Sequence, residues 1–326
     1  MIDFRYHLVS IIAVFLALAV GLLVGSTALS GKAVEALTAA QRAALSRNAS
    51  LQKQVGLYQK QITADQAFAT ASSKRLLDGL LTNQSVVIVT APGFDSSMIG
   101  GLRSALTEAG ATVTGEVDLQ PSFLVTTGQT ETSLTGLAQQ LADQAGLPAP
   151  TQSSSQVSGQ QAAAQVLAAS LLSRDGTGLS ASTSEQILKG LSQGGYLSIA
   201  SGGPAPAPAS LAILVTPSGT TPQTTGTVLV ATALALKNAG NGTVLAGPVS
   251  AIGPGSVIDA ENTAGNVSTV DDADTESGQI TTVWALYYLR NGKPAGQFGI
   301  SSGVVPSPAP SLSVSPTVSP STGAHK

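Results

Sequence analysis

Cysteine is absent from the 326-residue sequence, and histidine occurs only twice, as His7 and His325. The lack of cysteine excludes disulfides, thiolate-ligated zinc and a thiol nucleophile. Neither histidine lies in the central part of the chain, so a His-dependent catalytic triad has no base there. Four nitrogen or sulfur ligands for a zinc ion cannot be assembled either. We therefore expect a protein that is not an enzyme and that carries no cofactor.

Charged and aromatic residues are also scarce, at 10% and 4% of the chain, whereas 43% is apolar. About a quarter of a globular domain is usually charged. The charges are unevenly placed: residues 1–83 hold 8 Lys/Arg and 4 Asp/Glu, and residues 84–326 hold 7 and 14. The basic part suits anionic lipid head groups, and the acidic part argues against nucleic-acid binding.

One long apolar run follows a short flank, residues 1–7. From Leu8 to Leu29 there are 22 residues without a charge, enough to cross a hydrocarbon core of about 30 Å as a helix. A secretory signal has a shorter apolar core. We expect an uncleaved transmembrane helix over residues 8–29. The alternatives are a signal cleaved near Ser26–Ala28 and a buried core helix.

The charges beside this run do not settle its orientation. Arg5 precedes it, whereas Lys32, Arg42 and Arg47 follow it, which favours a cytoplasmic C-terminus; long domains, however, translocate largely regardless of charge. Residues 301–326 hold 5 Pro, 8 Ser and 2 Thr and are expected to be a disordered tail. Because such tails are frequent in envelope proteins, we expect a single-pass membrane protein with an extracytoplasmic domain.

Residues 30–83 are predicted to form a coiled-coil stalk. Apolar residues recur there at alternating spacings of three and four, the pattern of an a/d seam. We expect Leu51, Val55, Tyr58 and Ile62 to mediate homo-oligomerisation. The alternative is a single amphipathic helix that folds back on the following domain. The seam positions are Val34, Leu37, Gln41, Ala44, Asn48, Leu51, Val55, Tyr58, Ile62, Asp65, Ala69, Ser72 and Leu76.

Residues 84–300 are predicted to form an α/β domain with a doubly wound, mostly parallel sheet, because short β-branched runs alternate with helical segments. The first run, Ser85–Thr90, has the continuous apolar character of a buried parallel strand. The other expected strands are 112–117, 196–200, 212–216, 243–248 and 267–270, and the expected helices are 95–109, 134–145, 159–172, 184–192, 225–238 and 275–290.

No motif of catalysis or nucleotide binding occurs in the structural context that its function needs. The pattern G-x-S-x-G occurs around Ser192 and Ser301, but a nucleophile elbow needs a strand before the serine and a helix after it. Ser192 falls at the end of an expected helix, and Ser301 opens the tail. The sequence contains neither a P-loop nor a dinucleotide-binding glycine fingerprint. We interpret both serine matches as chance.

Two weak constellations remain. The turn Ala91–Asp95 offers backbone N–H groups to an anion, although an ordinary turn with Asp95 as helix N-cap is favoured. Asp271, Asp272 and Asp274 follow an expected strand, and three carboxylates there would suit a hard cation such as Mg²⁺ or Ca²⁺. The favoured alternative is that Asp274 caps the next helix and that the carboxylates stabilise its positive end.

Two stretches of the sequence, Met1–Gly21 and Val267–Gln279, resemble the actinobacterial copper transport protein family MctB. The resemblance extends from Met1 to about Gly299. It implies an envelope protein that limits intracellular copper, described in the family as an outer-membrane or pore-associated component. The βαβ pattern and single apolar helix suggest an inner-membrane anchor instead, since outer-membrane pores are barrels of alternating strands.

Copper(I) prefers thiolate, thioether and imidazole ligands, and the chain offers only Met1, Met98, His7 and His325. We therefore expect a role in copper transport or homeostasis in which copper ions are handled indirectly. The competing interpretation is an envelope structural protein that assembles partners through its coiled coil. A third, an enzyme or ligand receptor at the switch point of the sheet, has no residues to name.

Overall fold

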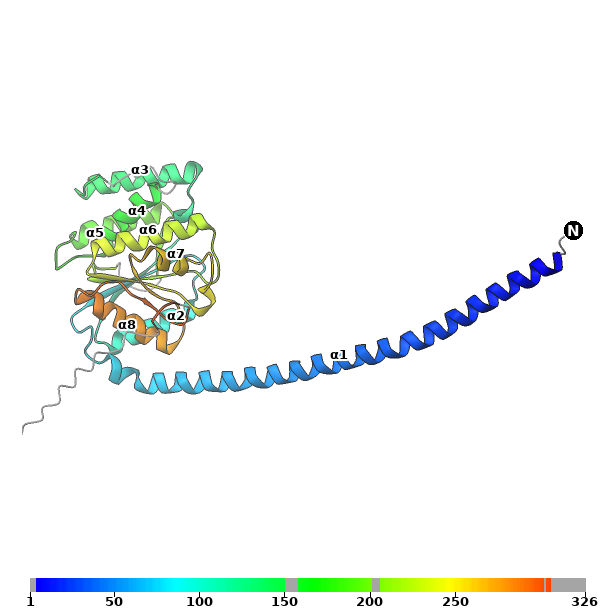
Figure 1. Ribbon diagram of the computed structural model, residues 1–326. Coiled ribbons are helices and arrows are strands. Elements are labelled where there is room, and N and C mark those ends of the chain that lie inside the picture. The colour runs from blue at the N-terminus through cyan, green and yellow to red at the C-terminus, as the bar shows by residue number, and fades with distance from the viewer. Residues whose placement is uncertain (1–3, 150–157, 201–205, 302, 306–326) are drawn as a thin grey trace, which may run out of the picture. The chain divides into compact units, whose positions relative to one another are not determined.

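The computed structural model describes residues 4–149, 158–200, 206–301 and 303–305. The chain divides into two compact units, Met1–Asp65 and Gln66–Lys326. The first consists of most of one long helix, and the second contains the sheet and all the other helices (Figure 1). Each unit is described by itself below.

A single helix, α1 (Phe4–Leu77), contains both the predicted membrane span and most of the predicted stalk. Its segment Tyr6–Gly25 has a mean hydropathy of 2.9, and by length and composition it is able to cross a membrane. The helix ends six residues before the predicted end of the stalk at residue 83. Gly79 and Asn83, with φ of 76° and 62°, reverse the chain there, because left-handed backbone cannot continue an α-helix.

The last turns of α1, from Gln66, belong to the second unit and pack on it. Leu77 is fully buried, and the Ser73 hydroxyl donates a 2.7 Å hydrogen bond to Glu108 Oε2. Ala69 packs against the same core. The packed face thus includes Ala69, which is a predicted seam position, and Ser73 and Leu77, which each follow one. The end of α1 therefore packs on this chain's own domain through a face next to the predicted seam.

The second unit is built on one seven-stranded sheet, in the order β3-β2-β1-β4-β5-β6-β7. Every neighbouring pair of strands is parallel except β2 and β3, which are antiparallel. The sheet is therefore mostly parallel, as predicted. The strands are β1 (Ser85–Thr90), β2 (Thr112–Leu119), β3 (Leu197–Ile199), β4 (Leu211–Val215), β5 (Gly242–Ala246), β6 (Ser268–Val270) and β7 (Gln297–Phe298).

Helices lie on both faces of this sheet (Figure 1). In β1, Val87 and Val89 contribute to one core, whereas Val86 and Ile88 contribute to the other, as the two-residue period of a strand requires. The first core includes residues of α3 (Gly128–Gln144), α4 (Ser158–Leu171), α5 (Ala181–Gln193), α6 (Gln223–Ala239) and α7 (Val257–Ala264), and the second those of α1, α2 (Ser96–Glu108) and α8 (Glu276–Arg290).

All six predicted strands and all six predicted helices of the domain are present, although α3 begins six residues before its predicted start at residue 134. The sequence did not reveal α7, which has only eight residues, or β7, which has two. Two short 3₁₀ turns, Pro121–Leu124 and Val249–Ala251, were also missed. Elements of this length carry too few residues for a periodic signal.

Backbone pairing continues past residue 301, where the predicted tail begins. The Gly299 N–H donates to the Val305 carbonyl at 3.0 Å, and the Val305 N–H donates to the Gln297 carbonyl at 2.9 Å. These bonds continue the pairing beside β7, so Val305 belongs to the domain because its backbone groups find partners there. Residues 306–326 of the predicted tail lie outside the described residues.

Candidate functional site at the β6–α8 turn

The turn between β6 and α8, residues 271–275, connects several parts of the second unit. The Ala273 N–H donates to the Gly247 carbonyl after β5 at 2.9 Å, and the Asp271 N–H donates to the Phe298 carbonyl of β7 at 3.2 Å. The Glu276 N–H donates to Gln66 Oε1, near the end of α1, at 2.8 Å. The segment that carries the predicted acidic site therefore joins three other segments.

Asp271 is fully buried and binds the backbone that follows β7. Its Oδ1 accepts a hydrogen bond from Ile300 N at 2.7 Å, and its Oδ2 accepts one from Ser301 N at 3.1 Å. Gly299 lies against this carboxylate, where a Cβ would come within 1.8 Å of Oδ1. Burial of the charge is compensated by these two donors.

Asp272 is also buried, but its carboxylate has fewer partners. Its Oδ2 accepts a long bond from Thr275 Oγ1 at 3.4 Å, and its buried Oδ1 has no hydrogen-bond partner among the described residues. Burial, followed by the negative charge of Asp271, raises the pKa of Asp272 from 3.8 to about 6. The ionised form of Asp272 is therefore poorly stabilised in this turn.

The N-cap of α8 is Thr275, whereas the sequence had suggested Asp274. Thr275 Oγ1 accepts a 3.0 Å hydrogen bond from Gly278 N, as hydroxyl N-caps do. Asp274 Oδ1 instead accepts a 2.8 Å bond from Val249 N. The Asp274 carboxylate therefore holds the loop after β5, and Glu276 is the acidic residue in the first turn of α8.

Two glycines allow helices to approach this turn closely. A Cβ on Gly278 would lie 2.0 Å from the backbone oxygen of Asp272. A Cβ on Gly101 of α2 would lie 2.2 Å from the side-chain amide nitrogen of Gln279. Since real Cβ atoms do not approach other atoms so closely, Gly278 is required for α8 to pack as it does, because the atom it would meet is backbone. At Gly101 a side chain would displace the amide of Gln279.

The three aspartates do not form a common site for a cation. Asp271 binds the backbone after β7, Asp274 binds the loop after β5, and Asp272 lies between them. Throughout the described ranges, no three His, Cys, Asp or Glu side chains are grouped so as to hold a metal ion. The geometry gives no support to the hard-cation alternative, and it assigns Asp271 and Asp274 to backbone binding.

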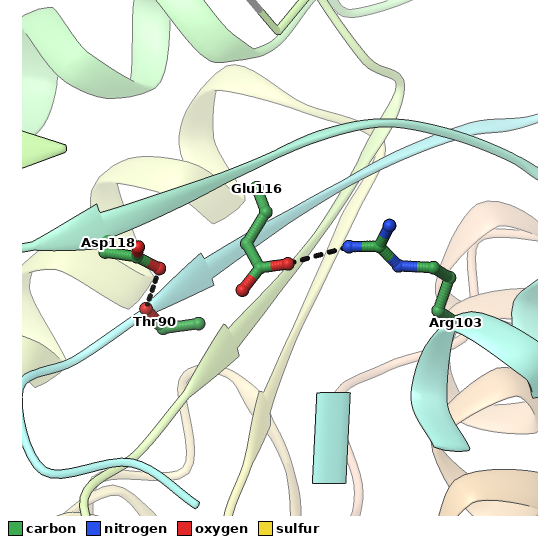
Figure 2. A network of polar contacts seen from close by, with 4 residues as sticks. All are labelled: Thr90, Arg103, Glu116 and Asp118. Atoms are coloured by element: carbon green, nitrogen blue, oxygen red, sulfur yellow. Dashed lines mark hydrogen bonds and ion pairs between the residues drawn. The ribbon is translucent and has the colours of Figure 1, made fainter. Parts of the chain in front are cut away.

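A second polar network lies on β1, β2 and α2 (Figure 2). The Thr90 hydroxyl donates to Asp118 Oδ1 at 2.7 Å, and Arg103 Nη2 forms a 2.8 Å ion pair with Glu116 Oε2. Burial, and then the charge of Asp118, raises the pKa of Glu116, which Arg103 partly counteracts. The network joins α2 to β2, and it leaves Glu116 as a half-buried carboxylate beside Asp118.

The sequence contains a signal for this network. Glu116 and Asp118 are two residues apart in a predicted strand, and side chains at that spacing lie on the same face. The strand prediction ended at residue 117, whereas β2 continues to Leu119. A strand that extends to Leu119 places the carboxylates of Glu116 and Asp118 on one face of the sheet.

The turn Ala91–Asp95, the other candidate site from the sequence, has a local structural role. Asp95 is the N-cap of α2, where its Oδ1 accepts from Ser97 N at 2.9 Å. A hydrogen bond from the Ser97 hydroxyl, followed by this one from the Ser97 backbone, lowers the pKa of Asp95. The turn Ala91–Asp95 is therefore an ordinary capped βα turn, as favoured from the sequence.

Neither G-x-S-x-G serine lies in a strand-to-helix elbow. Ser192 is in the last turn of α5, and Ser301 donates its backbone N–H to Asp271. In the first unit, the four predicted oligomerisation residues are exposed on α1: Leu51, Val55, Tyr58 and Ile62. His7 also lies in α1, whereas His325 lies outside the described residues.

Comparison with known proteins identifies the family. The sequence model described as "Copper transport outer membrane protein, MctB" matches residues 1–307. The proteins named "Copper transporter MctB" of Mycobacterium bovis and Mycobacterium tuberculosis are 31% identical over 124 residues, which is 38% of this chain and 40% of theirs. The alignment thus spans two fifths of these curated relatives. Because the family model covers nearly the whole sequence, the chain belongs to the MctB family of copper transport outer membrane proteins.

Proposed function

We propose that this protein is a membrane-anchored component of copper transport or copper homeostasis in the cell envelope. The observation that carries the proposal is the family match over residues 1–307, within which the chain keeps the N-terminal apolar helix. The curated relatives that share 31% identity over part of the chain are named copper transporters, which supports copper as the transported species.

The anchor is assigned to α1. Its segment Tyr6–Gly25 has the length and composition to cross a membrane, and the basic excess of residues 1–83 suits the adjoining head groups. We infer that the α/β domain lies outside the cytoplasm. Because the chain lacks cysteine, a Glu185→Cys variant on α5 tests this: an impermeant maleimide should label it in intact spheroplasts, and labelling only after lysis would reverse the topology.

We further infer that the stalk part of α1 assembles copies of the chain as a coiled coil. The seam residues Leu51, Val55, Tyr58 and Ile62 are between 52% and 63% exposed in the single chain. Apolar side chains at heptad spacing lose this exposure when a second helix packs on them. Asn48 at one seam position has the character of a register-setting residue.

Copper handling is proposed to be indirect and not enzymatic. Tight Cu(I) sites need soft ligands held close together, and the chain has no cysteine and two methionines. Met98, in α2, is 1% exposed and packs in the second core, so its sulfur is held away from solvent. We propose that copper passes through a partner or through a path formed between subunits.

The domain is proposed to be a doubly wound scaffold without a ligand at its switch point. Support for this comes from helices on both faces and from the two cores that they cover. Where β1 and β4 end, the usual ligand crevice of such sheets, the Ser218 N–H donates to the Gly93 carbonyl at 3.0 Å. This bond joins the two loops, which disfavours the receptor alternative at that point.

The alternative function is that of an envelope structural protein that assembles partners through its stalk. The exposed apolar seam of α1 favours it, because the same surface serves assembly whether or not copper is involved. The two functions differ in what happens to cellular copper when the protein is removed.

The copper content of cells lacking the gene separates the two. Cells without the protein, grown in medium with added copper, should contain more copper than the parent strain, and expression of the full chain should restore the parental level. Cellular zinc, measured in the same samples, should not change. Equal copper in the deletion and parent strains would leave the structural function as the better account.

A further inference from the structure

A basic cleft lies where the strands β5 and β6 begin. The acidic β6–α8 turn lies at the opposite end of these strands. The cleft has a volume of about 450 Å³ and is formed by the first residues of β5 and β6 together with the C-terminal ends of α6 and α8. This volume is within the range of small-molecule sites. The polar side chains that line it include Arg174, Lys237, Thr243, Ser268, Arg290 and Lys293.

The cleft concentrates the positive charge of an acidic domain. Residues 84–326 contain 7 Lys/Arg and 14 Asp/Glu, yet four of those seven basic residues line this one cleft. Its one acidic residue is Asp175, whose Oδ1 accepts a hydrogen bond from Asn241 Nδ2 at 3.1 Å. The resulting local excess of positive charge favours an anion.

Two of the four cations bind the protein itself. Arg174 donates from Nε and Nη2 to the Gly240 carbonyl and from Nη2 to the Lys237 carbonyl, at 2.9–3.1 Å. Lys237 Nζ donates to the Asn266 carbonyl at 2.6 Å. The Arg174 bonds satisfy carbonyls at the end of α6, and the Lys237 bond satisfies a carbonyl between α7 and β6. The attraction of cations to helix C-termini accounts for the placement of both side chains at the end of α6.

The other two cations have no such partners. The side chains of Arg290 and Lys293 are exposed, and within the part of the chain that the structure describes they form no hydrogen bond or ion pair. Arg290 is in the last turn of α8, where the helix end attracts a cation. Lys293 lies beyond that helix, so the helix end does not explain it.

A buried hydroxyl at the cleft is also unpartnered. Thr243 of β5 is 1% exposed, and its Oγ1 has no hydrogen-bond partner among the described residues. A buried donor without a partner is costly, so this hydroxyl points to a ligand or water that binds it. Thr243 and the free Lys293 are two independent observations on the same cleft.

We propose that this cleft binds a phosphate-bearing anion. Lys293 and Arg290 supply the charges, because guanidinium and ammonium groups are the usual protein ligands of phosphate. The hydroxyl of Thr243 supplies a neutral donor. The anion is either a free phosphorylated compound or the head group of a phospholipid, which share this chemistry.

The test is a calorimetric titration of the full chain, in a non-ionic detergent at fixed ionic strength, with pyrophosphate. Lys293→Glu should weaken binding roughly tenfold or more, the effect of losing one charge-assisted bond. Lys293→Arg should retain it. Lys189→Glu is the matched control, because Lys189 lies on α5, outside the residues that line the cleft; this variant should bind like the wild type.

A second titration identifies the source of the anion. Glycerophosphoglycerol, a soluble phospholipid head group, is tested as a competitor of pyrophosphate. Competition at similar concentration indicates a lipid head group, and its absence indicates a free phosphorylated compound; either outcome requires the cleft. The proposal is overturned if the wild type binds neither compound, or if Lys293→Glu and Lys189→Glu weaken binding equally.

Discussion

The carboxylate of Asp271 accepts a hydrogen bond from the backbone N–H of Ile300 at 2.7 Å, so the turn after β6 holds the segment that follows β7. A second bond, from Ser301 N to Oδ2 at 3.1 Å, completes the contact. The edge strand β7 pairs with β6 through only two residue pairs. The Asp271 carboxylate therefore supplies much of the attachment of this edge.

Replacing Asp271 with Ala should destabilise the domain by about 2–4 kcal/mol, because two backbone N–H groups lose a charged acceptor. The free energy of unfolding in urea measures this. Hydrogen exchange at Ile300 and Ser301 should also become faster. Asp143→Ala, on an exposed position of α3, is the control and should change stability by less than about 0.5 kcal/mol. Equal effects of the two variants would contradict the assigned role.

Replacing Gly278 with Ala should be strongly destabilising, by about 3 kcal/mol or more, since its Cβ would meet the Asp272 backbone oxygen at 2.0 Å. Gly136→Ala provides the matched control. It is also helical, on α3, and nothing lies within 4 Å of its Cβ position, so it should stabilise by about 0.5–1 kcal/mol. Thermal unfolding of both variants distinguishes them by the sign of the shift in Tm.

The raised pKa of Asp272 predicts a specific dependence of stability on pH. Between its ordinary 3.8 and about 6, the folded state holds a proton that the unfolded state has released, so this group's contribution to stability falls as pH rises through that window. The total loss is about 2–3 kcal/mol.

Asp272→Asn should therefore stabilise the protein more at pH 7.5 than at pH 4.5, since the amide carries no charge at either pH. The Tm of the variant minus that of the wild type, measured at both pH values, checks this. For Asp143→Asn, the control at an exposed site, the difference in Tm from the wild type should be the same at the two pH values. If the stabilisation by Asp272→Asn does not depend on pH, the cost of burying the ionised Asp272 carboxylate is not the cause of the stabilisation.

The stalk prediction concerns assembly. In a fragment beginning at Lys32, Leu51→Asp with Ile62→Asp should abolish self-association, because each buried large apolar side chain contributes about 1.5–3 kcal/mol before entropy costs. Ser50→Asp with Thr63→Asp adds the same charge outside the seam and should leave the assembly intact. Sedimentation velocity is the measurement. If the unmodified fragment sediments as a monomer, the coiled-coil proposal is lost.

The longer elements of the domain were predictable because each has a local signal. Ser85–Thr90 is a continuous β-branched run, and α8 follows a strand with cap residues before it. The capping error shows the limit of such signals: Asp274 and Thr275 are both good N-cap residues, and the choice depends on Val249, which binds Asp274 from a distant loop. Sequence spacing alone does not contain that contact.

From the sequence, the site at the β6–α8 turn could be predicted only as a cluster of aspartates. Asp271, Asp272 and Asp274 are adjacent in sequence, but their partners lie at residues 300, 275 and 249. The division of roles among them follows from tertiary packing. The basic cleft has the same origin, because Arg174, Lys237 and Lys293 are brought together by three separate segments.

The central claim is that the protein acts in copper handling without a tight copper site of its own. The full chain, purified in detergent under reducing conditions, is titrated with Cu(I) in competition with a calibrated chelator. Because it has no cysteine and its Met98 sulfur is buried, we expect no stoichiometric binding at sub-nanomolar Cu(I). Stoichiometric binding in that range, lost on Met98→Leu, would contradict the account and establish direct binding of copper by this chain.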